Sequence, residues 1–299
     1  MTHATSLPRT HSPGAVVRDY LELSKARIVL MVLLTAAAGF AIASRGPVDW
    51  LLFAHLMIGT ALIAGGTNAL NQFAERDLDA RMNRTRHRPL PDGRITPRAA
   101  LTFSVTISVL GALYLASLVN PLTSILGALT LGSYLFIYTP LKQKTNLSTI
   151  VGAVPGAIPP MMGWAAATGR IEFGAWVMFA ILFLWQLPHF LAIGWLYRED
   201  YERAGFSILS VTDRSGRVSG QQALLWSLVL VPISLLPVLD VIPGPLYAAG
   251  AVAAGSLLVV TSFGFARVPT MRTARHLFLA SIVYLPLIMS LLVVTSRSQ

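Results

Sequence analysis

Three oxygen-bearing side chains follow one another at helical spacing near residue 75. Asn71, Glu75 and Asp79 are four residues apart in the sequence. If a helix runs through this stretch, the three side chains lie on one face, because a step of four residues drifts only about 40° around the axis. Carboxylate and carboxamide oxygens suit a hard cation such as Mg²⁺ better than zinc. We therefore expect a magnesium site at Glu75 and Asp79, with Asp77 on the opposite, solvated face.

An arginine-rich stretch follows Asp79 directly. Arg81, Arg84, Arg86 and Arg88 lie within the next nine residues. Guanidinium groups offer planar, paired donors that match phosphate oxygens, so carboxylates followed by arginines are what a metal-bridged diphosphate requires. The alternative is that these arginines only anchor a membrane helix on one side. That alternative leaves the acids unexplained, because acids at a membrane edge are costly and usually functional.

A second polar set lies in a later stretch of the chain. His189 falls within an apolar segment, and Asp200 follows eleven positions later. On an unbroken helix these two side chains would lie on nearly the same face. We expect Asp200 to be a third metal ligand that faces Glu75 and Asp79. His189 could form a hydrogen bond between helices, carry a proton or ligate a metal.

Both stretches resemble the signatures of the UbiA-type intramembrane prenyltransferases. The first signature matches Asn71 to Arg94, including the Arg-Thr-x-x-Arg-Pro-Leu-Pro run at 84–91. Glutamate at position 75, where many members have aspartate, resembles the haem-farnesylating branch of the family. The second signature matches the Trp-Gln-x-Pro-His-Phe run at 185–190 and the Glu-Asp-Tyr-x-x-Ala-Gly run at 199–205. The resemblance covers the chain from Ser24 to the last apolar segment.

The resemblance implies a reaction and its participants. Members of that branch transfer the farnesyl group of farnesyl diphosphate to a vinyl group of haem b, with addition of water, which gives haem O for terminal oxidases. It implies Mg²⁺ as cofactor and haem b as substrate; further partners would be membrane lipid and a downstream haem A synthase or terminal oxidase assembly. It also implies that Lys142, Arg84 and Arg88 contact the diphosphate. Lys25 either joins these residues or only anchors its helix at the membrane interface. One of the possible roles of His189 is then ligation of the haem iron.

The sequence departs from the family pattern after the second signature. The family usually continues Gly-x-Pro-Met-Leu-Pro-Val, whereas residues 205–211 here read Gly-Phe-Ser-Ile-Leu-Ser-Val. We expect the loss of these prolines to loosen the loop, although no candidate ligand is lost. The predicted site is then made of the catalytic residues Asn71, Glu75, Asp79 and Asp200, of which Glu75, Asp79 and Asp200 bind the metal, and the substrate-binding residues Arg84, Arg88, Lys142, Lys25 and His189.

The composition requires membrane helices to position these residues. The 299-residue chain is 54% hydrophobic and only 12% charged, whereas soluble domains have about 25% charged residues. It contains no cysteine, which excludes disulfides and thiolate metal sites, and its N-terminal residues lack the apolar core of a signal peptide. Apolar stretches of roughly the 20 residues needed to cross a bilayer recur at 28–44, 50–70, 99–118, 122–139, 147–167, 173–196, 223–239, 247–266 and 277–294.

We therefore predict an all-α polytopic membrane protein with about nine transmembrane helices bundled around a central cavity. Residues 1–27 would form a cytoplasmic N-terminal segment, and residues 28–299 a single transmembrane prenyltransferase domain with catalytic cytoplasmic loops near 71–98 and 197–222. With a cytoplasmic N-terminus, the 23 lysines and arginines all lie on the inner side except Arg45, Arg170 and Arg297. This placement, rather than a nucleic-acid partner, explains the net charge of +10. It predicts a protein of the bacterial inner membrane with its site on the cytoplasmic side.

Two other functions fit parts of the sequence. A prenyltransferase of the same superfamily could act on a quinone precursor or a lipid, although the run at 185–190 argues for haem. A haem transporter without chemistry belongs to a different class. Transporters often place charged residues near the midplane of the membrane, whereas the acids here cluster at one membrane face. Release of diphosphate that depends on Mg²⁺ would separate an enzyme from a transporter.

Overall fold

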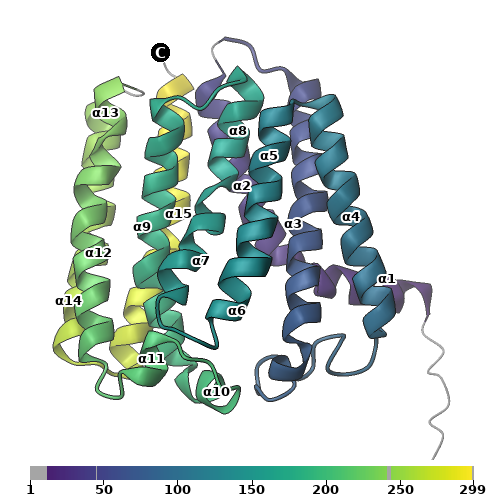
Figure 1. Ribbon diagram of the computed structural model, residues 1–299. Coiled ribbons are helices and arrows are strands. Elements are labelled where there is room, and N and C mark those ends of the chain that lie inside the picture. Colours follow the sequence, from purple (N-terminus) through teal and green to yellow (C-terminus); the bar gives the residue numbers. More distant parts are fainter. Residues whose placement is uncertain (1–11, 45, 241–243, 298–299) are drawn as a thin grey trace, which may run out of the picture.

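The computed structural model describes residues 12–44, 46–240 and 244–297 (Figure 1). Residues 1–11 of the predicted N-terminal segment and Arg45 of a predicted outer loop lie outside these ranges, and the side chain of Arg297 is not described. The described chain is helical and contains no strand. Its elements are α1 (Pro13–Leu23), α2 (Ala26–Ala43), α3 (Trp50–Asp79), α4 (Pro97–Leu118), α5 (Pro121–Gly132), the π-helix η1 (Ser133–Tyr138), α6 (Thr139–Leu141), α7 (Ser148–Ala157), α8 (Pro159–Thr168), α9 (Phe173–Leu196), α10 (Arg198–Arg203), α11 (Leu209–Thr212), α12 (Arg217–Leu235), α13 (Pro237–Asp240), α14 (Pro245–Arg267) and α15 (Met271–Arg297).

Nine helical stretches of the described chain are long and apolar enough to cross a membrane. They are α2, α3, α4, the joined α5, η1 and α6, the joined α7 and α8, α9, α12 with most of α13, α14, and α15. Their outward faces carry exposed apolar side chains such as Leu113, Phe136 and Val260, which lipid can cover. The chain is therefore an integral membrane protein, and the predicted all-α fold with about nine membrane-spanning helices is confirmed.

Small residues let α2 cross α8 at close range. A side chain at Gly39 would meet the backbone oxygen of Pro160 at 2.0 Å, and one at Gly163 would meet that of Ala36 at 1.9 Å. Such close approach through small residues is a common way for membrane helices to pack without a hydrophobic driving force. The most enclosed spans are α7–α8, of which 72% of the apolar window is buried, and α9, with 61%. The core of the bundle therefore lies around these helices.

Prolines interrupt two of the spans. Pro140 has no N–H to give to the preceding turn, and the helix before it widens into the π-helix η1. α7 ends at Ala157 and α8 begins at Pro159, followed by a second proline at position 160. The predicted intervals 122–139 and 147–167 are therefore correct as membrane spans but not as uninterrupted helices.

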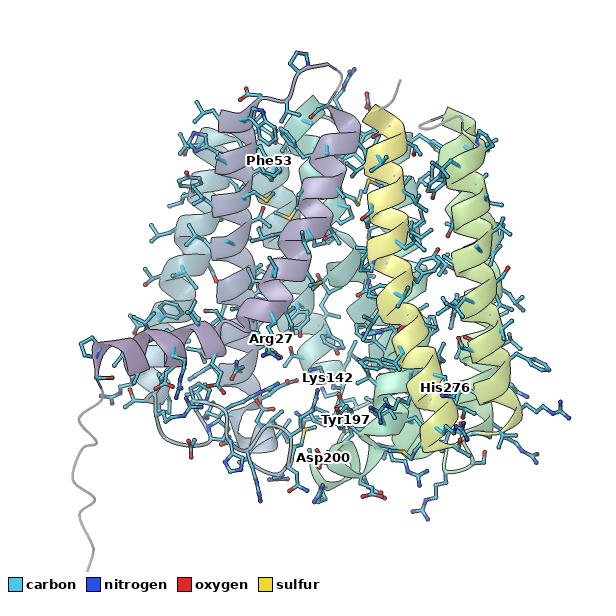
Figure 2. All side chains as sticks on the ribbon, turned by 180° about the vertical axis from the view of Figure 1, so that it is seen from behind. Arg27, Phe53, Lys142, Tyr197, Asp200 and His276 are labelled. Atoms are coloured by element: carbon cyan, nitrogen blue, oxygen red, sulfur yellow. The ribbon has the colours of Figure 1, made fainter. Side chains whose placement is uncertain are left out.

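One end of the bundle carries α1, α10 and α11, and we call it the site end (Figure 1). The loops 80–96, 142–147 and 204–216 belong to the same end, where α1 lies across the bundle axis rather than along it. Lys142, Tyr197 and Asp200 lie there among many side-chain nitrogen and oxygen atoms (Figure 2). The sequence prediction placed no helix within residues 1–27, so α1 is an addition to it.

Candidate active site

The end of α3 carries the first predicted set of site residues on one face. The helix continues to Asp79 instead of ending near residue 70, so Asn71, Glu75 and Asp79 do follow one another along it. All three side chains are buried, whereas Asp77 is exposed and pairs only with its neighbour Arg76 at 3.6 Å. The expected placement of Asn71, Glu75 and Asp79 on one face of α3, with Asp77 on a solvated face, is confirmed. We call Asn71, Glu75 and Asp79 the α3 cluster.

Each acid of the α3 cluster is paired with a cation from another part of the chain. Lys142 Nζ lies 2.6 Å from Glu75 Oε1, and the Arg88 guanidinium lies 2.7 Å from Asp79 Oδ2. We call the loop at residues 80–96 the arginine-rich loop. Thr85 Oγ1 donates to the backbone oxygen of Asp79 at 2.9 Å, which fixes the start of this loop to the end of α3. Two buried carboxylates and two cations therefore share one site, which is the charge pattern that a diphosphate and a metal ion could enter.

Asn71 bridges two other elements with its carboxamide. Its oxygen accepts a hydrogen bond from Lys25 Nζ at 2.8 Å, and its nitrogen donates to Thr139 Oγ1 at 3.2 Å. Lys25 therefore lies in the site, beside a residue that the sequence predicted as catalytic. It has φ 53° and ψ 56°, and among the described residues it alone combines a side chain with a positive φ. Such a left-handed conformation costs about 1–2 kcal/mol for an L-residue and tends to occur at functional sites.

The π-helix explains how Lys142 reaches the site. Pro140 prevents a regular helix, and Thr139 satisfies the carbonyl of Tyr134 with both its backbone N–H and its hydroxyl, the latter at 2.9 Å. The Lys142 amine then lies 4.5 Å from the centroid of the Tyr138 ring, within cation–π range. Sequence reasoning selected Lys142 but missed Thr139 and both tyrosines. Their signal in the sequence was the proline two residues before a lysine at a helix end.

Two lysines of the site differ in their proton affinity. Burial of its amine, followed by the nearby charge of Arg88, lowers the pKa of Lys25 to about 7. Burial is again the largest single influence and acts to lower the pKa of Lys142, but the interactions of its amine with Tyr138, Glu75 and Tyr134 together outweigh burial, and that pKa is raised above the ordinary lysine value. Lys142 is thus a permanent cation, whereas the charge of Lys25 changes near neutral pH.

Asp200 of α10 is held to the loop after α3 through backbone N–H groups of that loop. Its carboxylate oxygens accept hydrogen bonds from the N–H groups of Asn83 at 3.3 Å and Arg84 at 3.2 Å, and it forms an ion pair with Arg203 one turn along α10. We call this arrangement the α10 clasp. Asp200 is buried and contacts the arginine-rich loop, whereas its predicted place opposite Glu75 and Asp79 stays a prediction; Arg203 is a partner that sequence reasoning missed.

The assumption that His189 and Asp200 share a helix face is wrong. α9 ends at Leu196, and a new helix, α10, begins at Arg198 after Tyr197 leaves helical geometry with ψ 22°. Arg84, predicted to bind diphosphate, lies with its guanidinium 4.9 Å from the Tyr197 ring centroid. It also donates to the hydroxyl of Tyr201 at 3.2 Å. The break therefore places two tyrosines beside an arginine of the first signature.

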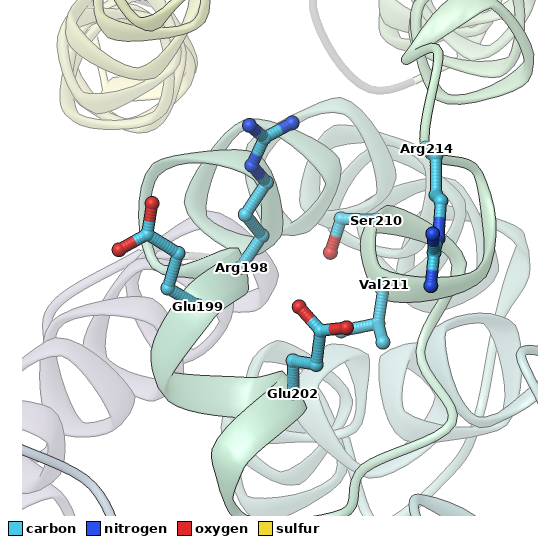
Figure 3. Close-up of a pocket in the computed structure, with 6 residues that line it drawn as sticks. All are labelled: Arg198, Glu199, Glu202, Ser210, Val211 and Arg214. Carbon is cyan, nitrogen blue, oxygen red and sulfur yellow. The ribbon is translucent and has the colours of Figure 1, made fainter.

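The opposite face of α10 borders a polar pocket of about 340 Å³ (Figure 3). Arg198, Glu199 and Glu202 of α10 line it, together with Ser210, Val211 and Arg214. Since Asp200 points to the arginine-rich loop, the two glutamates lie on the side of α10 that faces away from the α3 cluster. They are therefore not part of the candidate site.

The loop after α10 is tied down instead of loosened. At position 207, where the family usually has proline, the N–H of Ser207 donates to the backbone oxygen of Lys142 at 2.8 Å, and the hydroxyl donates to that of Gln143 at 3.0 Å. Proline could not donate the first of these bonds. The expectation that the missing prolines loosen this loop is therefore wrong at Ser207, which instead holds the segment that carries Lys142.

His189 connects α9 to α15. Its Nδ1 lies 2.7 Å from Ser281 Oγ, and that hydroxyl donates its one hydrogen to the backbone oxygen of Phe278 at 2.6 Å. Ser281 must then accept from Nδ1–H, so the lone pair of the ring lies on Nε2. The ring is stacked between Trp185 at 5.0 Å and Phe278 at 5.3 Å. A hydrogen bond between helices is thus present, while iron ligation and proton transfer through Nε2 remain predictions.

The donor set suits a hard divalent cation. The described residues contain no group of three or more His, Cys, Asp and Glu side chains arranged to hold a metal without help. Glu75 and Asp79 are buried carboxylates on one helix face, and Mg²⁺ typically uses one or two carboxylates with water and substrate phosphates for the rest. Asp200 is engaged by backbone N–H groups and Arg203, so its predicted role as a third ligand stays a prediction.

The sequence and the fold of this chain are similar to those of known proteins. Residues 32–284 match the family described as the UbiA prenyltransferase family. A protoheme IX farnesyltransferase from Solibacter usitatus is 44% identical over 285 residues, which cover 92% of this chain and 98% of the relative. A digeranylgeranylglyceryl phosphate synthase structure has a TM-score of 0.79 at 17% identity and covers 95% of this chain and 99% of its own. A UbiA homologue from Archaeoglobus fulgidus bound to GPP and Mg²⁺ has a TM-score of 0.68 at 13% identity, covering 92% of this chain and 99% of its own.

Proposed function

Because this chain belongs to the UbiA prenyltransferase family, we propose that it transfers the farnesyl group of farnesyl diphosphate to a vinyl group of haem b. Water is added in the same reaction, and the products are haem O and diphosphate. The relative from Solibacter usitatus is named for protoheme IX farnesyl transfer and aligns with nearly the whole chain, which supports both the donor and the acceptor.

The observation that carries the proposal is the pairing of buried acids with cations at the site end. Lys142 lies 2.6 Å from Glu75 although the two residues are 67 positions apart, and Arg88, in the loop that follows α3, lies 2.7 Å from Asp79. A buried ion pair is costly to assemble and is a poor device for stability alone. Charges gathered where a diphosphate must leave can instead stabilise the negative charge that develops on it.

The reaction begins when the bond between C1 of the farnesyl group and the diphosphate oxygen breaks. The electron pair leaves with the diphosphate, and Lys142 and Arg88 are placed to donate hydrogen bonds to its oxygens, joined by Lys25 and Arg84. The vinyl group of haem b supplies the electrons for the new carbon–carbon bond. Water adds to the resulting cation and releases a proton, which completes the hydroxyethylfarnesyl side chain.

Mg²⁺, when bound, would neutralise charge on the departing diphosphate. Glu75, Asp79 and Asp200 are its proposed ligands, and all three are buried. The Archaeoglobus fulgidus structure, which is bound to GPP and Mg²⁺, supports a requirement for this metal. Asn71 would position the Lys25 amine, because its carboxamide forms hydrogen bonds with both Lys25 and Thr139.

The lysine and arginine pattern supports an orientation for the site. We place the site end in the cytoplasm of a bacterial cell, with the bundle in the inner membrane, so that farnesyl diphosphate arrives from water and its tail enters the bilayer. His189 is proposed to meet the haem through Nε2. The product would pass to a downstream haem A synthase or terminal oxidase assembly.

The mass of the product tests donor, acceptor and reaction together. Purified protein is incubated with haem b, farnesyl diphosphate and Mg²⁺, and the haem fraction is analysed by mass spectrometry. The expected mass is that of haem b plus one farnesyl group and one hydroxyl group, because the added water loses a proton, and chelation of Mg²⁺ should abolish this product. A parallel screen offers aromatic acids and lipids as acceptors. If one of these is farnesylated while haem b stays unchanged, the acceptor is not haem b and the proposal is wrong on this point. Unchanged substrates throughout would contradict an enzymatic role.

A further inference from the structure

The helix α1 has three faces with different chemistry. Asp19 and Leu23 are buried against the bundle. Asp19 and Glu22 both pair with Arg94 of the arginine-rich loop, Glu22 at 2.9 Å. Val17 and Leu21, one turn apart, are 60% and 54% exposed. At about 100° per residue, both lie about 160° around the helix from Asp19. The apolar pair is therefore nearly opposite the face that is tied to the polar loop.

The position of α1 matches the edge of the lipid-facing surface. Tyr20 packs on Phe103 of α4 with ring centroids 4.7 Å apart. Exposed apolar residues continue on two of the helices beside α1, with Ile28, Leu30 and Met31 on α2 and Leu101 and Val105 on α4. α1 lies across the bundle axis at this level (Figure 1). Its apolar face is thus continuous with the surface that the bilayer covers.

We propose that α1 is a membrane-interface helix whose Val17 and Leu21 side chains enter the acyl region of the bilayer at the site end. The polar side of the helix would stay in the headgroup layer, where the exposed Arg18, and Arg27 at the start of α2, meet lipid phosphates. An apolar face combined with a charged face is the pattern of helices that lie in the plane of the interface. The partner is a lipid surface rather than another protein, because the exposed face joins surfaces that already face lipid.

Contacts at the end of α1 connect this lipid contact to the site. Gln72 Nε2 donates to the backbone oxygens of Glu22 and Leu23 at 2.9 and 2.8 Å, so α1 ends on the helix that carries the α3 cluster. The next residues lead to Lys25, whose left-handed backbone redirects the chain into α2 and whose amine reaches Asn71. Lipid contact at Val17 and Leu21 therefore sets the position of the Lys25 amine. This second step rests on the proposed function, since it assigns Lys25 to the diphosphate.

Spin labelling tests the placement of α1 without reference to activity. The chain has no cysteine, so single substitutions Val17→Cys, Leu21→Cys, Arg18→Cys and Leu113→Cys each give one labelled site. The full-length protein is reconstituted in vesicles of phosphatidylethanolamine and phosphatidylglycerol, and power saturation is measured with oxygen and with a water-soluble nickel chelate. Labels at 17 and 21 should favour oxygen, as should the lipid-facing control at 113, and the label at 18 should favour nickel. Labels at 17 and 21 that behave like the one at 18 would overturn the proposal.

A charge placed on the apolar face tests the connection to Lys25. The double variant Val17→Glu with Leu21→Glu should raise the KM for farnesyl diphosphate by about tenfold, the order expected when a charge-assisted hydrogen bond is lost. The matched control Val17→Leu with Leu21→Ile changes the same two positions but keeps the face apolar, and it should change KM by no more than about twofold. An unchanged KM in the double variant would disprove the coupling. If the wild-type protein does not use farnesyl diphosphate, the proposed function fails, while the spin labels still decide where α1 lies.

Discussion

The α3 cluster and the α10 clasp hold acids at the same end of the bundle in different ways. The acids of the α3 cluster stand on a 30-residue helix that crosses the membrane, and side-chain cations pair with them. Asp200 stands on a helix of six residues, and it receives backbone N–H groups from the opposite loop. The first arrangement fixes charges relative to the bundle, whereas the second fixes one loop relative to the other.

The difference predicts different consequences for the loss of an acid. Removing an acid from the α3 cluster leaves the scaffold in place and unbalances the charges around the diphosphate. Removing the carboxylate of Asp200 releases the arginine-rich loop, which carries Arg84 and Arg88. Activity falls in both cases, but only the second change should alter the order of a loop.

The largest effect is expected from Asp79→Asn. The change removes a buried negative charge that pairs with Arg88 and is a proposed metal ligand, so kcat for farnesyl transfer should fall by about a hundredfold or more. The control Asp77→Asn lies on the exposed face of the same helix turn and should keep its rate. Steady-state turnover at saturating farnesyl diphosphate measures both variants. Near-native turnover of Asp79→Asn would exclude the α3 cluster from the metal site.

Asp200→Asn is expected to have the next largest effect. An asparagine offers one oxygen acceptor in place of two and cannot pair with Arg203, so the rate should fall by roughly tenfold to a hundredfold. Hydrogen exchange at the amides of Asn83 and Arg84 should become faster at the same time. Glu199→Gln, on the face of α10 that borders the polar pocket, is the control and should change neither quantity. Unchanged exchange in Asp200→Asn would show that the clasp is not what orders the loop.

The two lysines predict a pH dependence of substrate binding. With a pKa of about 7, Lys25 loses its charge as the pH rises above neutral, while Lys142 keeps its charge. Diphosphate binds best to the protonated amine, so the KM for farnesyl diphosphate should rise with pH, by about tenfold for each pH unit until the pKa of the bound state is reached. Lys25→Arg keeps its charge throughout and should flatten this rise. If KM rises with pH in the same way in the wild type and in Lys25→Arg, a group other than Lys25 must lose the proton.

Ser207→Pro is expected to have the smallest effect. The change restores the residue that the family usually carries and removes the N–H that donates to Lys142. One lost hydrogen bond costs about 1 kcal/mol, which the rigid proline ring partly offsets, so KM should change by about twofold to threefold. Ser207→Ala keeps the N–H and should match the wild-type KM. A larger effect of alanine than of proline would show that the hydroxyl, rather than the backbone, positions the loop.

Much of the α3 cluster could be predicted from the sequence because one helix contains it. A spacing of four residues places Asn71, Glu75 and Asp79 on one face as long as the helix continues, and it does. The α10 clasp could be predicted only in part. The sequence selected Asp200, but the break at Tyr197 carries neither proline nor glycine, so a continuous helix to His189 was the simpler expectation.

The nine membrane spans followed from hydropathy, but their interruptions and α1 did not. The π-helix depends on Pro140, which has no N–H for the preceding turn, and on Thr139, which donates both its N–H and its hydroxyl to the carbonyl of Tyr134; a hydropathy average registers neither. α1 has the pattern of an amphipathic helix from Val16 to Leu23, yet it is too short and too polar to count as a span. The pairing of each acid with its cation joins residues up to 67 positions apart, and spacing along the chain carries no information about it.

The α10 clasp also determines which substitutions the arginine-rich loop can accept. Asp200 holds this loop by the N–H groups of positions 83 and 84, and nineteen of the twenty amino acids supply such a group. The loop can therefore change its side chains there during evolution, and with them its contacts to a substrate, without losing its attachment. Proline is the exception, since it has no N–H to give. A substitution scan of position 83 should tolerate most residues and select against proline.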